Sequence, residues 1–277
     1  MNAKQWFLGG ALGSLLLSAR DRVALLGAAL SDNPEGIGTL ANDQLAGLLV
    51  TRLSKPNSTF LDIGAHIGSV SASVLRYDSS VKVEAIEAMP DKAADLRRKF
   101  PIVKVHECAI GDRETEVAFF VNTRQSGYSS LGKPAGQAAE AITAISVPMK
   151  TLDGLVESSA VDVIKIDIEG AELGALLGGQ RLIEQCRPTV MFESAPGDAN
   201  GLGFTKEAMW QFFEQRGYEI VVPNRLAHNG AGLTQGGFVE SHLYPRRCTN
   251  YFAVASERRL ELRDRARSIL GIRERAA

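Results

Sequence analysis

Acidic residues stand at the ends of four β-rich runs of this sequence. They are Asp62, Glu87, Asp167 and Glu193. Ligands of open α/β sheets bind outside the carboxyl ends of the strands, near the point where the strand order reverses. The four carboxylates are therefore expected to lie together at one edge of a sheet. There they could bind hydroxyl-bearing or cationic groups, or accept a proton during a reaction.

A glycine loop follows the first of these acids. Residues 62–68 read Asp-Ile-Gly-Ala-His-Ile-Gly, and Ser69, a helix-capping residue type, comes next. Glycines let the backbone approach a ligand closely, and the free N–H groups at a helix start attract a carboxylate or a phosphate. The segment therefore predicts a cofactor cradle, whose candidate residues are Asp62, Gly64, Ala65, His66 and Gly68.

The acids and the glycine spacing indicate which cofactor is bound. Glu87 lies nineteen residues past Gly68, where an acid accepts both hydroxyls of an adenosine ribose. The Gly-x-x-x-Gly spacing departs from the Gly-x-Gly-x-x-Gly fingerprint of pyrophosphate binding. Asp62 would repel a pyrophosphate but suits a ligand with an ammonium and a sulfonium group, which is S-adenosylmethionine. A carboxylate satisfied by nearby backbone N–H groups is the alternative for Asp62.

Three further residues are expected to line the nucleoside part of this cofactor. Ala88 follows the ribose acid directly, and Cys108 and Ala109 end the next β-rich run. Small and apolar side chains at these positions would sandwich an adenine base.

A charged stretch in the middle of the chain carries the candidate catalytic residues. In residues 163–170, Lys165, Asp167 and Glu169 alternate with isoleucines and would share one side of a strand. Central parallel strands are normally apolar on both faces, so these charges must pair with each other or with a ligand. Lys165 is expected to neutralise one carboxylate. Repulsion among the others would raise the pKa of one of them toward the range of a general base.

Asp167 is the first choice for that base, followed by Glu169 or Glu193. A divalent ion held by the same oxygens is the alternative, and it is not favoured because no His lies within the motif.

Two long stretches interrupt the alternation of elements, at residues 122–145 and 223–249. Long loops in a compact domain are usually functional. The candidate substrate-binding residues are Lys165 and four residues of these stretches, Ser129, Ser130, His228 and His242. An ordinary serine-rich turn and ordinary loop histidines are the alternative interpretations.

The elements that must position these residues follow from the alternation of short β-rich runs with amphipathic stretches after Thr59. This pattern predicts an α/β fold with a seven-stranded, mainly parallel sheet. The predicted strands are 59–63, 81–87, 103–108, 163–167, 189–193, 218–222 and 251–255, and the predicted helices are 42–53, 69–76, 91–99, 172–185 and 205–216. We expect a helical extension at residues 1–57, a catalytic domain at 58–256 and a helix at 257–277.

Composition narrows the surroundings in which the protein works. With 277 residues, of which 45% are hydrophobic, the chain can bury one sizeable core. The formal net charge of −1 predicts no nucleic-acid partner. Three widely separated cysteines predict a reducing cytoplasm and no disulfide framework. Oligomeric state is left open.

The apolar run from Trp6 to Leu17 is too short to span a bilayer. A pair of helices packed on the domain is the favoured interpretation, and an interfacial anchor is the alternative.

The motifs together resemble those of the FkbM family of methyltransferases. The matching pieces, spread over about residues 58–255, are 61–68, 86–90, 109–112, 129–131, 150–153 and 164–172, and the last reads Ile-Lys-Ile-Asp-Ile-Glu-Gly-Ala-Glu. The resemblance implies a class I methyltransferase fold with helices on both faces of the sheet. It also implies S-adenosylmethionine as the methyl donor, and O-methylation of a sugar, glycan or secondary-metabolite hydroxyl.

Two departures from the family pattern lie in the cofactor region. His66 stands where the family often has Asn, and residues 87–90 read Glu-Ala-Met-Pro where it often has Glu-Pro. A nicotinamide-dependent oxidoreductase and a non-catalytic S-adenosylmethionine-binding module are the alternative functions.

Overall fold

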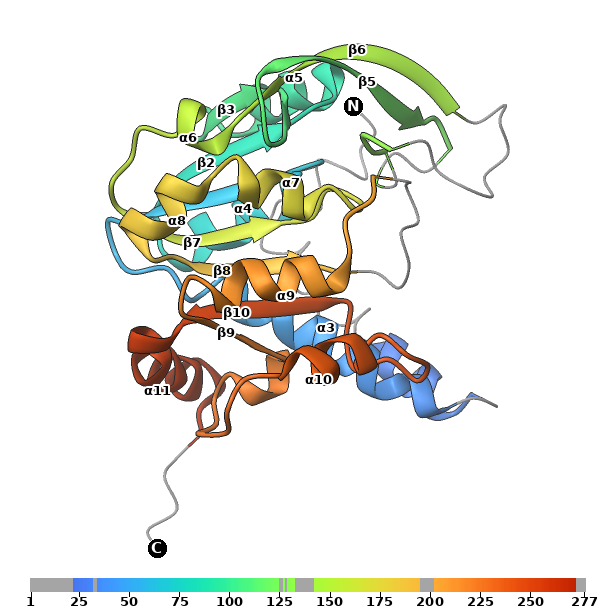
Figure 1. Cartoon of the computed structure of the whole chain (residues 1–277), viewed down its shortest axis with the longest axis vertical. Coiled ribbons are helices and arrows are strands. Elements are labelled where there is room, and N and C mark those ends of the chain that lie inside the picture. The colour runs from blue at the N-terminus through green and yellow to red at the C-terminus, as the bar shows by residue number, and fades with distance from the viewer. Residues whose placement is uncertain are drawn as a thin grey trace, which may run out of the picture.

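A seven-stranded sheet runs through the molecule in the order β3-β2-β1-β7-β8-β10-β9 (Figure 1). The computed structural model describes residues 22–31, 34–124, 127, 129–132, 142–194 and 202–272. The strands are β1 (Thr59–Ile63), β2 (Lys82–Glu87), β3 (Lys104–Glu107), β7 (Val161–Ile166), β8 (Thr189–Glu193), β9 (Tyr218–Val221) and β10 (Asn250–Ala255). Only β10 pairs antiparallel with its neighbours in this sheet, so the predicted seven-stranded, mainly parallel sheet is confirmed.

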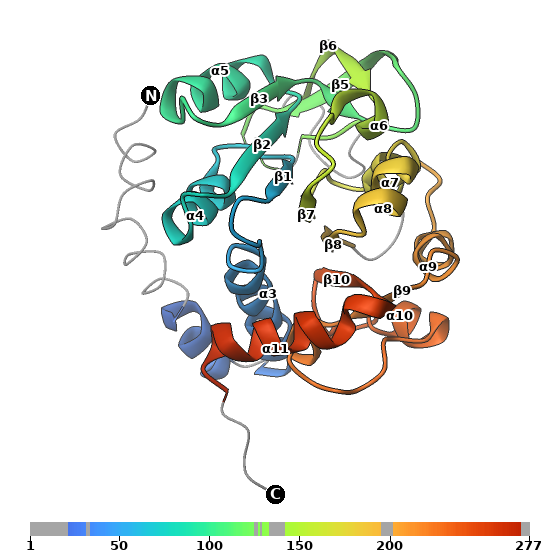
Figure 2. The same ribbon diagram turned by 90° about the vertical axis from the view of Figure 1, so that its left-hand side faces the viewer.

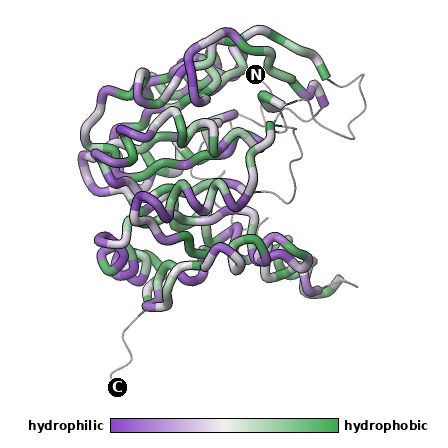
Figure 3. The backbone as a smooth tube through the Cα atoms, in the orientation of Figure 1, coloured by the Kyte–Doolittle hydropathy of each residue, from purple (hydrophilic) through white to green (hydrophobic). Residues whose placement is uncertain are grey.

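Helices cover both faces of the sheet (Figure 2). One face carries α3 (Ile37–Val50), α4 (Ser69–Tyr77), α5 (Pro90–Lys99) and α11 (Arg259–Leu270). The other carries α6 (Leu152–Leu155), α7 (Glu172–Leu177), α8 (Gln180–Cys186), α9 (Lys206–Glu214) and α10 (Gln235–Glu240). The 3-10 helices are η1 (Pro34–Gly36), η4 (Pro223–Arg225) and η5 (Ser256–Arg258). Polar and apolar positions alternate along the helices, as expected for elements with one buried face (Figure 3).

The central strands contribute to a separate apolar core on each face. In β7, Ile164 and Ile166 pack into the core under α7 and α8, whereas Val163 packs into the core under α3 and α4. All three are at most 1% exposed. Because β7 is buried on both faces, its position in the sheet is fixed. The positions of the residues that directly follow it are fixed as well.

A second, three-stranded sheet occupies a region that the sequence analysis leaves partly as an irregular insertion. It has the order β4-β6-β5, from β4 (Ala109–Ile110), β5 (Thr115–Asn122) and β6 (Ile142–Lys150). Strands β5 and β6 pair antiparallel over their whole lengths, and we call this sheet the small sheet. Its strands lie outside the βαβ alternation on which the prediction rests, so that prediction misses them.

The predicted helix 172–185 is wrong in one respect, because it is two helices separated by Gly178 and Gly179. A Cβ atom on Gly178 would lie 2.0 Å from the carbonyl oxygen of Gly111. The chain breaks where the small sheet approaches it most closely, and only glycine fits there.

The stretch 223–249 is not a plain loop, since it contains η4 and α10. The apolar run Trp6–Leu17 lies outside the described residues. Within the part of the chain that the structure describes, no helix is both long and apolar enough to cross a bilayer.

Candidate active site

A cavity of about 760 Å³ opens at the carboxyl ends of β1, β2 and β7, and we call it the central cavity. It is lined by Ile63, Gly64, His66, Ile86, Glu87, Ala88, Met89, Cys108, Ala109, Ile110, Phe119, Gly127, Ser129, Leu131, Asp167, Ile168 and Glu169. Residues far apart in the sequence meet here because parallel strands end at the same edge.

Glu87 joins the glycine loop to the turn after β2. Its Oε2 accepts a hydrogen bond of 2.7 Å from the backbone N–H of His66, and its Oε1 accepts one of 2.9 Å from that of Met89. The side chain is buried, and burial raises the pKa of Glu87. Each carboxylate oxygen can accept a further hydrogen bond. Glu87 can therefore also accept the hydroxyls of a bound ligand.

The glycine loop owes its shape to left-handed backbone conformations. Gly64 has φ +76°, and a Cβ atom there would lie 1.9 Å from the carbonyl oxygen of Asp167. Gly68 has φ +77° and is the N-cap of α4. Ser69 is therefore the first helical residue, not the predicted cap. The loop after β1 and the loop after β7 are packed directly against each other.

Asp62 lies beneath this loop and does not line the central cavity. It is fully buried, and its Oδ2 accepts hydrogen bonds from the backbone N–H and the hydroxyl of Ser71 in the first turn of α4. Its Oδ1 lies 3.5 Å from Nζ of Lys165. Both contacts are with groups of the protein itself. They agree with the alternative interpretation of Asp62, in which nearby groups of the chain satisfy its carboxylate.

Lys165 contacts two carboxylates, where the sequence predicts one. Its ammonium lies 3.4 Å from Asp167 and 3.5 Å from Asp62, and it donates a hydrogen bond of 2.8 Å to the carbonyl of Gly64. Burial alone would lower the pKa of Lys165, but the two carboxylates outweigh burial and raise it. The buried cation thus fastens the glycine loop to the end of β7.

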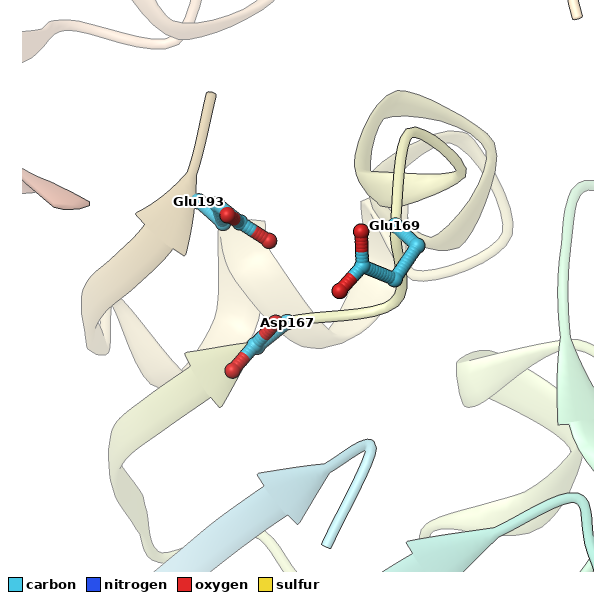
Figure 4. Close-up of side chains that lie close together, drawn as sticks. All are labelled: Asp167, Glu169 and Glu193. Atoms are coloured by element: carbon cyan, nitrogen blue, oxygen red, sulfur yellow. The ribbon is translucent and has the colours of Figure 1, made fainter. Parts of the chain in front are cut away.

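Three carboxyl groups converge beyond β7 and β8 (Figure 4). Carboxyl oxygens of Asp167, Glu169 and Glu193 lie within 4.8 Å of one another. Burial alone would raise the pKa of Asp167, but Lys165 and a hydrogen bond with Glu193 lower it. Burial and the charge of Asp167 raise the pKa of Glu193 well above its usual value. Glu193 therefore holds its proton at neutral pH and donates a hydrogen bond to the Asp167 carboxylate.

Glu169 lies on the loop after β7. The prediction that it shares one side of a strand with Lys165 and Asp167 is therefore wrong. Strand β7 ends at Ile166, and Glu169 has φ +55°. Its carboxyl group lines the central cavity. Burial, and then the charge of Asp167, raise the pKa of Glu169 to about 7. Of the three acids, this one has a pKa matched to proton transfer near neutral pH.

Glu172 holds the loop that carries Glu169, and the sequence analysis misses this role. It is buried, and its Oε1 accepts hydrogen bonds of 3.1 Å from the backbone N–H groups of Ile168 and Gly170. Burial raises the pKa of Glu172 to about 7. A signal was available, because an acid in the first turn of a helix commonly accepts hydrogen bonds from preceding N–H groups.

The other predicted cofactor residues divide into two groups. His66, Ala88, Cys108 and Ala109 line the central cavity with Gly64 and Glu87, whereas Ala65 and Gly68 do not. Burial lowers the pKa of His66, and nearby lysines lower it further. His66 is therefore neutral at pH 7.

The two serines have different positions. Ser129 lines the central cavity, and its hydroxyl accepts a hydrogen bond from the backbone N–H of Asn122. Ser130 forms a β-bridge with Phe120 and donates to the carbonyl of Gly132, so it serves the small sheet.

Neither histidine of the 223–249 stretch lines the central cavity. His228 is exposed. His242 is only 5% exposed, with Nδ1 2.8 Å from the carbonyl of Phe238 and Nε2 2.8 Å from the hydroxyl of Ser194. Burial lowers its pKa to about 4. His242, a candidate substrate-binding residue from sequence, is thus a buried, neutral ring that packs in the core and does not reach the central cavity.

Several cavity residues were not predicted, among them Phe119 and Leu131 from the small-sheet region, and Met89 and Ile168 from the loops after β2 and β7. The continuous apolar run of residues 117–121 was the available signal for the first of these.

Comparison with known proteins found related methyltransferases. The chain is 26% identical over 156 residues to the 2-O-methyltransferase NoeI of Sinorhizobium fredii, a match covering 50% of this chain and 64% of that protein. The match thus spans less than two thirds of that relative's length.

Two solved structures are also similar. The methyltransferase FkbM of Methylobacillus flagellatus matches at 17% identity with a TM-score of 0.45, over 85% of this chain and 59% of that one. A small RNA methyltransferase matches at 12% identity with a TM-score of 0.36, over 76% of this chain and 24% of that one.

The family comparison covers the site itself. The model of the methyltransferase FkbM domain matches residues 62–220, which begin at the buried acid of β1 and include the glycine loop, Glu87 and all three clustered acids. This span is more than half of the 277 residues. With a seven-stranded class I sheet and a matching domain over most of it, the chain belongs to the FkbM family of methyltransferases.

Proposed function

We propose that this protein transfers a methyl group from S-adenosylmethionine to a hydroxyl group of a small-molecule or glycan acceptor. The observation that carries the proposal is that Glu87 and the Asp167–Glu169 pair line one cavity. Glu87 suits the ribose hydroxyls of a nucleoside, and the Asp167–Glu169 pair suits proton transfer. Membership of a methyltransferase family sets aside the nicotinamide-dependent alternative.

The central cavity fits the donor in charge and in shape. Glu87, Asp167 and Glu169 line it, and Asp62 lies just beneath, whereas the buried cation Lys165 contacts only Asp62 and Asp167 of these acids. A cationic ligand is therefore favoured over an anionic one. The apolar side chains of Ile86, Met89, Cys108 and Phe119 provide walls for a flat base. When bound, the donor supplies an electrophilic methyl group on a positively charged sulfur.

Glu169 is proposed as the general base for the acceptor hydroxyl. It lines the cavity and has a pKa of about 7, so a large fraction of it is ionised at neutral pH while it remains basic enough to take a proton. Asp167, the first choice from sequence, stays ionised beside Lys165 and is the weaker base. We assign Asp167 to orienting the acceptor hydroxyl. Glu193, which does not line the cavity, is assigned to positioning Asp167.

Transfer to oxygen is supported by one relative, whose name describes a 2-O-methyltransferase. The three clustered carboxyl groups could also hold a divalent ion that prefers oxygen ligands. We favour a reaction without a metal, because Lys165 and the proton of Glu193 already offset much of the negative charge. The proposed setting is the cytoplasm, as the scattered cysteines predict.

Calorimetric titration tests the donor. S-adenosylhomocysteine is expected to bind with micromolar affinity and NAD is expected not to bind. Glu87→Ala should weaken binding of the first without unfolding the protein. Binding of NAD in place of S-adenosylhomocysteine would overturn the proposal.

Transfer of a labelled methyl group into fractionated pools then tests the acceptor. Label is expected in hydroxyl compounds of the small-molecule or glycan pool, and it should persist in the presence of EDTA. An RNA pool runs in parallel, and label there would contradict the expected acceptor class. Donor binding with no transfer into any pool would favour a non-catalytic binding module.

A further inference from the structure

A second cavity adjoins the central one. It has a volume of about 790 Å³ and lies between the small sheet and α7. Both ribbon views place the small sheet against the α7 side of the molecule (Figures 1 and 2). Its lining is Ile110, Gly111, Asp112, Arg113, Val117, Ala118, Leu131, Met149, Ala171, Gly174, Leu202 and Phe204.

The two cavities share a wall. Ile110 and Leu131 line both of them. The loop after β7 also borders both, because Ile168 and Glu169 line the central cavity and Ala171 lines the second. The two cavities are therefore neighbours, with Ile110 and Leu131 between them.

The lining of the second cavity is chemically simple. Among the described residues that line it, most are aliphatic or glycine, and Phe204 is the one aromatic residue. The charged residues of this described lining are Asp112 and Arg113, which are exposed and lie 3.5 Å from each other. Among the described residues, the buried polar side-chain atoms that lack a hydrogen bond all lie elsewhere. These walls have no buried group to recognise a sugar or a phosphate, but they can take up a flexible apolar chain.

We propose that the second cavity binds an alkyl or acyl chain attached to the acceptor, so that the acceptor is an amphiphile. Its hydroxyl group lies at Glu169 and its apolar chain lies between the small sheet and α7. The inference rests on the proposed function for the position of the hydroxyl group. Each fully buried methylene group favours binding roughly fourfold, so chain length should control affinity.

Titration of the protein saturated with S-adenosylhomocysteine tests this inference. The probes are octyl glucoside, kept below its micelle concentration, and methyl glucoside. The octyl compound is expected to bind at least tenfold more tightly. Equal affinity for the two glucosides, or no binding of the octyl compound, would overturn the proposal.

Matched variants on the small sheet test the location. Ala118 is exposed on β5 and lines the second cavity only, so Ala118→Trp fills the cavity and Ala118→Asp places a charge in it. Both should abolish the preference for the octyl chain. Thr143, exposed on β6, lines neither cavity, and Thr143→Trp and Thr143→Asp should keep the preference. A preference retained in both Ala118 variants would contradict the proposed location.

Binding of S-adenosylhomocysteine to every variant separates this inference from the proposed function. If the nucleoside binds and the alkyl preference is missing, only the amphiphile proposal fails. If the nucleoside does not bind, the donor assignment fails instead.

Discussion

The three clustered carboxyl groups differ in charge because each has different neighbours. Asp167 lies beside the Lys165 ammonium, and Glu193 keeps its proton and donates a hydrogen bond to Asp167. For Glu169, burial and then the charges of Asp167 and Glu172 outweigh the effect of Lys165 and raise the pKa to about 7. Three chemically similar side chains thereby take an anionic, a neutral and a titrating role within 4.8 Å of one another.

Glu169→Gln is expected to lower kcat by a factor of about 10² to 10⁴, the usual contribution of a general base. Affinity for S-adenosylhomocysteine should stay close to that of the parent protein. A base must be deprotonated to act, so kcat of the parent protein should rise with pH through about 7. The variant should lose this rise. An unchanged pH–rate profile in Glu169→Gln would remove the residue from its role.

At this scale the sequence identifies the residue types but not their surroundings. The acids at the strand ends are legible in the sequence, and Asp167 and Glu169 do line the cavity. That Asp62 is buried against α4, and that His242 is enclosed by Phe238 and Tyr251, depends on contacts between distant segments. The sequence alone contains no local signal for either.

At the scale of elements, the small sheet contacts the main domain at the break between α7 and α8. The backbone of Gly178 meets that of Gly111, and the backbone of Gly174 approaches the same residue. Such contact is possible only where side chains are absent. The small sheet supplies one wall of both cavities. Its position relative to the main domain therefore depends on glycines that lie outside any ligand motif.

Gly178→Ala is expected to destabilise the protein by about 1 to 3 kcal/mol, because a methyl group would overlap the carbonyl of Gly111. Gly47→Ala is the matched control, since Gly47 lies within α3 with nothing within 4 Å of its Cβ position. It should be neutral or stabilising by about 0.5 to 1 kcal/mol. Urea unfolding of the three proteins measures both effects. Equal stability of the two variants would show that the contact with Gly111 is relaxed.

The strands of the main sheet were predictable because each combines β-rich composition with a position in the βαβ alternation. The small sheet was not, because β5 and β6 form a hairpin outside that alternation. The helix break was missed for a related reason. Amphipathic spacing continues across residues 172–185, and only tertiary contacts, of Gly178 with Gly111 and of Gly179 with Leu152, require glycines at the break.

At the scale of the whole molecule, buried acids make stability depend on pH. Glu172 is buried and has a pKa of about 7, above the ordinary value of 4.5. The folded state therefore binds more protons than the unfolded state between these pH values. The free energy of unfolding should accordingly fall as pH rises from about 4.5 to about 7.

Glu172→Gln should remove this loss, because the amide oxygen can still accept the hydrogen bonds from Ile168 and Gly170 without carrying a charge. The variant and the parent protein should be similarly stable at pH 4.5. At pH 7.5 the variant should be more stable by up to roughly 3 kcal/mol. Glu207→Gln, exposed on α9, is the control and should follow the parent protein. Parallel stability curves for Glu172→Gln and the parent protein would contradict the assignment.

The direct packing of Gly64 against the carbonyl of Asp167 has a practical consequence for protein engineering. Because the loops after β1 and β7 pack directly against each other, the main sheet alone positions the end of the central cavity that carries Asp167 and Glu169. The roof over it comes instead from the segment that carries the small sheet, which packs on Ala88 and Met89 and comes close to Gly178 at Gly111. Exchanging that stretch between members of the family should therefore create chimeras that accept new molecules while leaving the reaction chemistry intact.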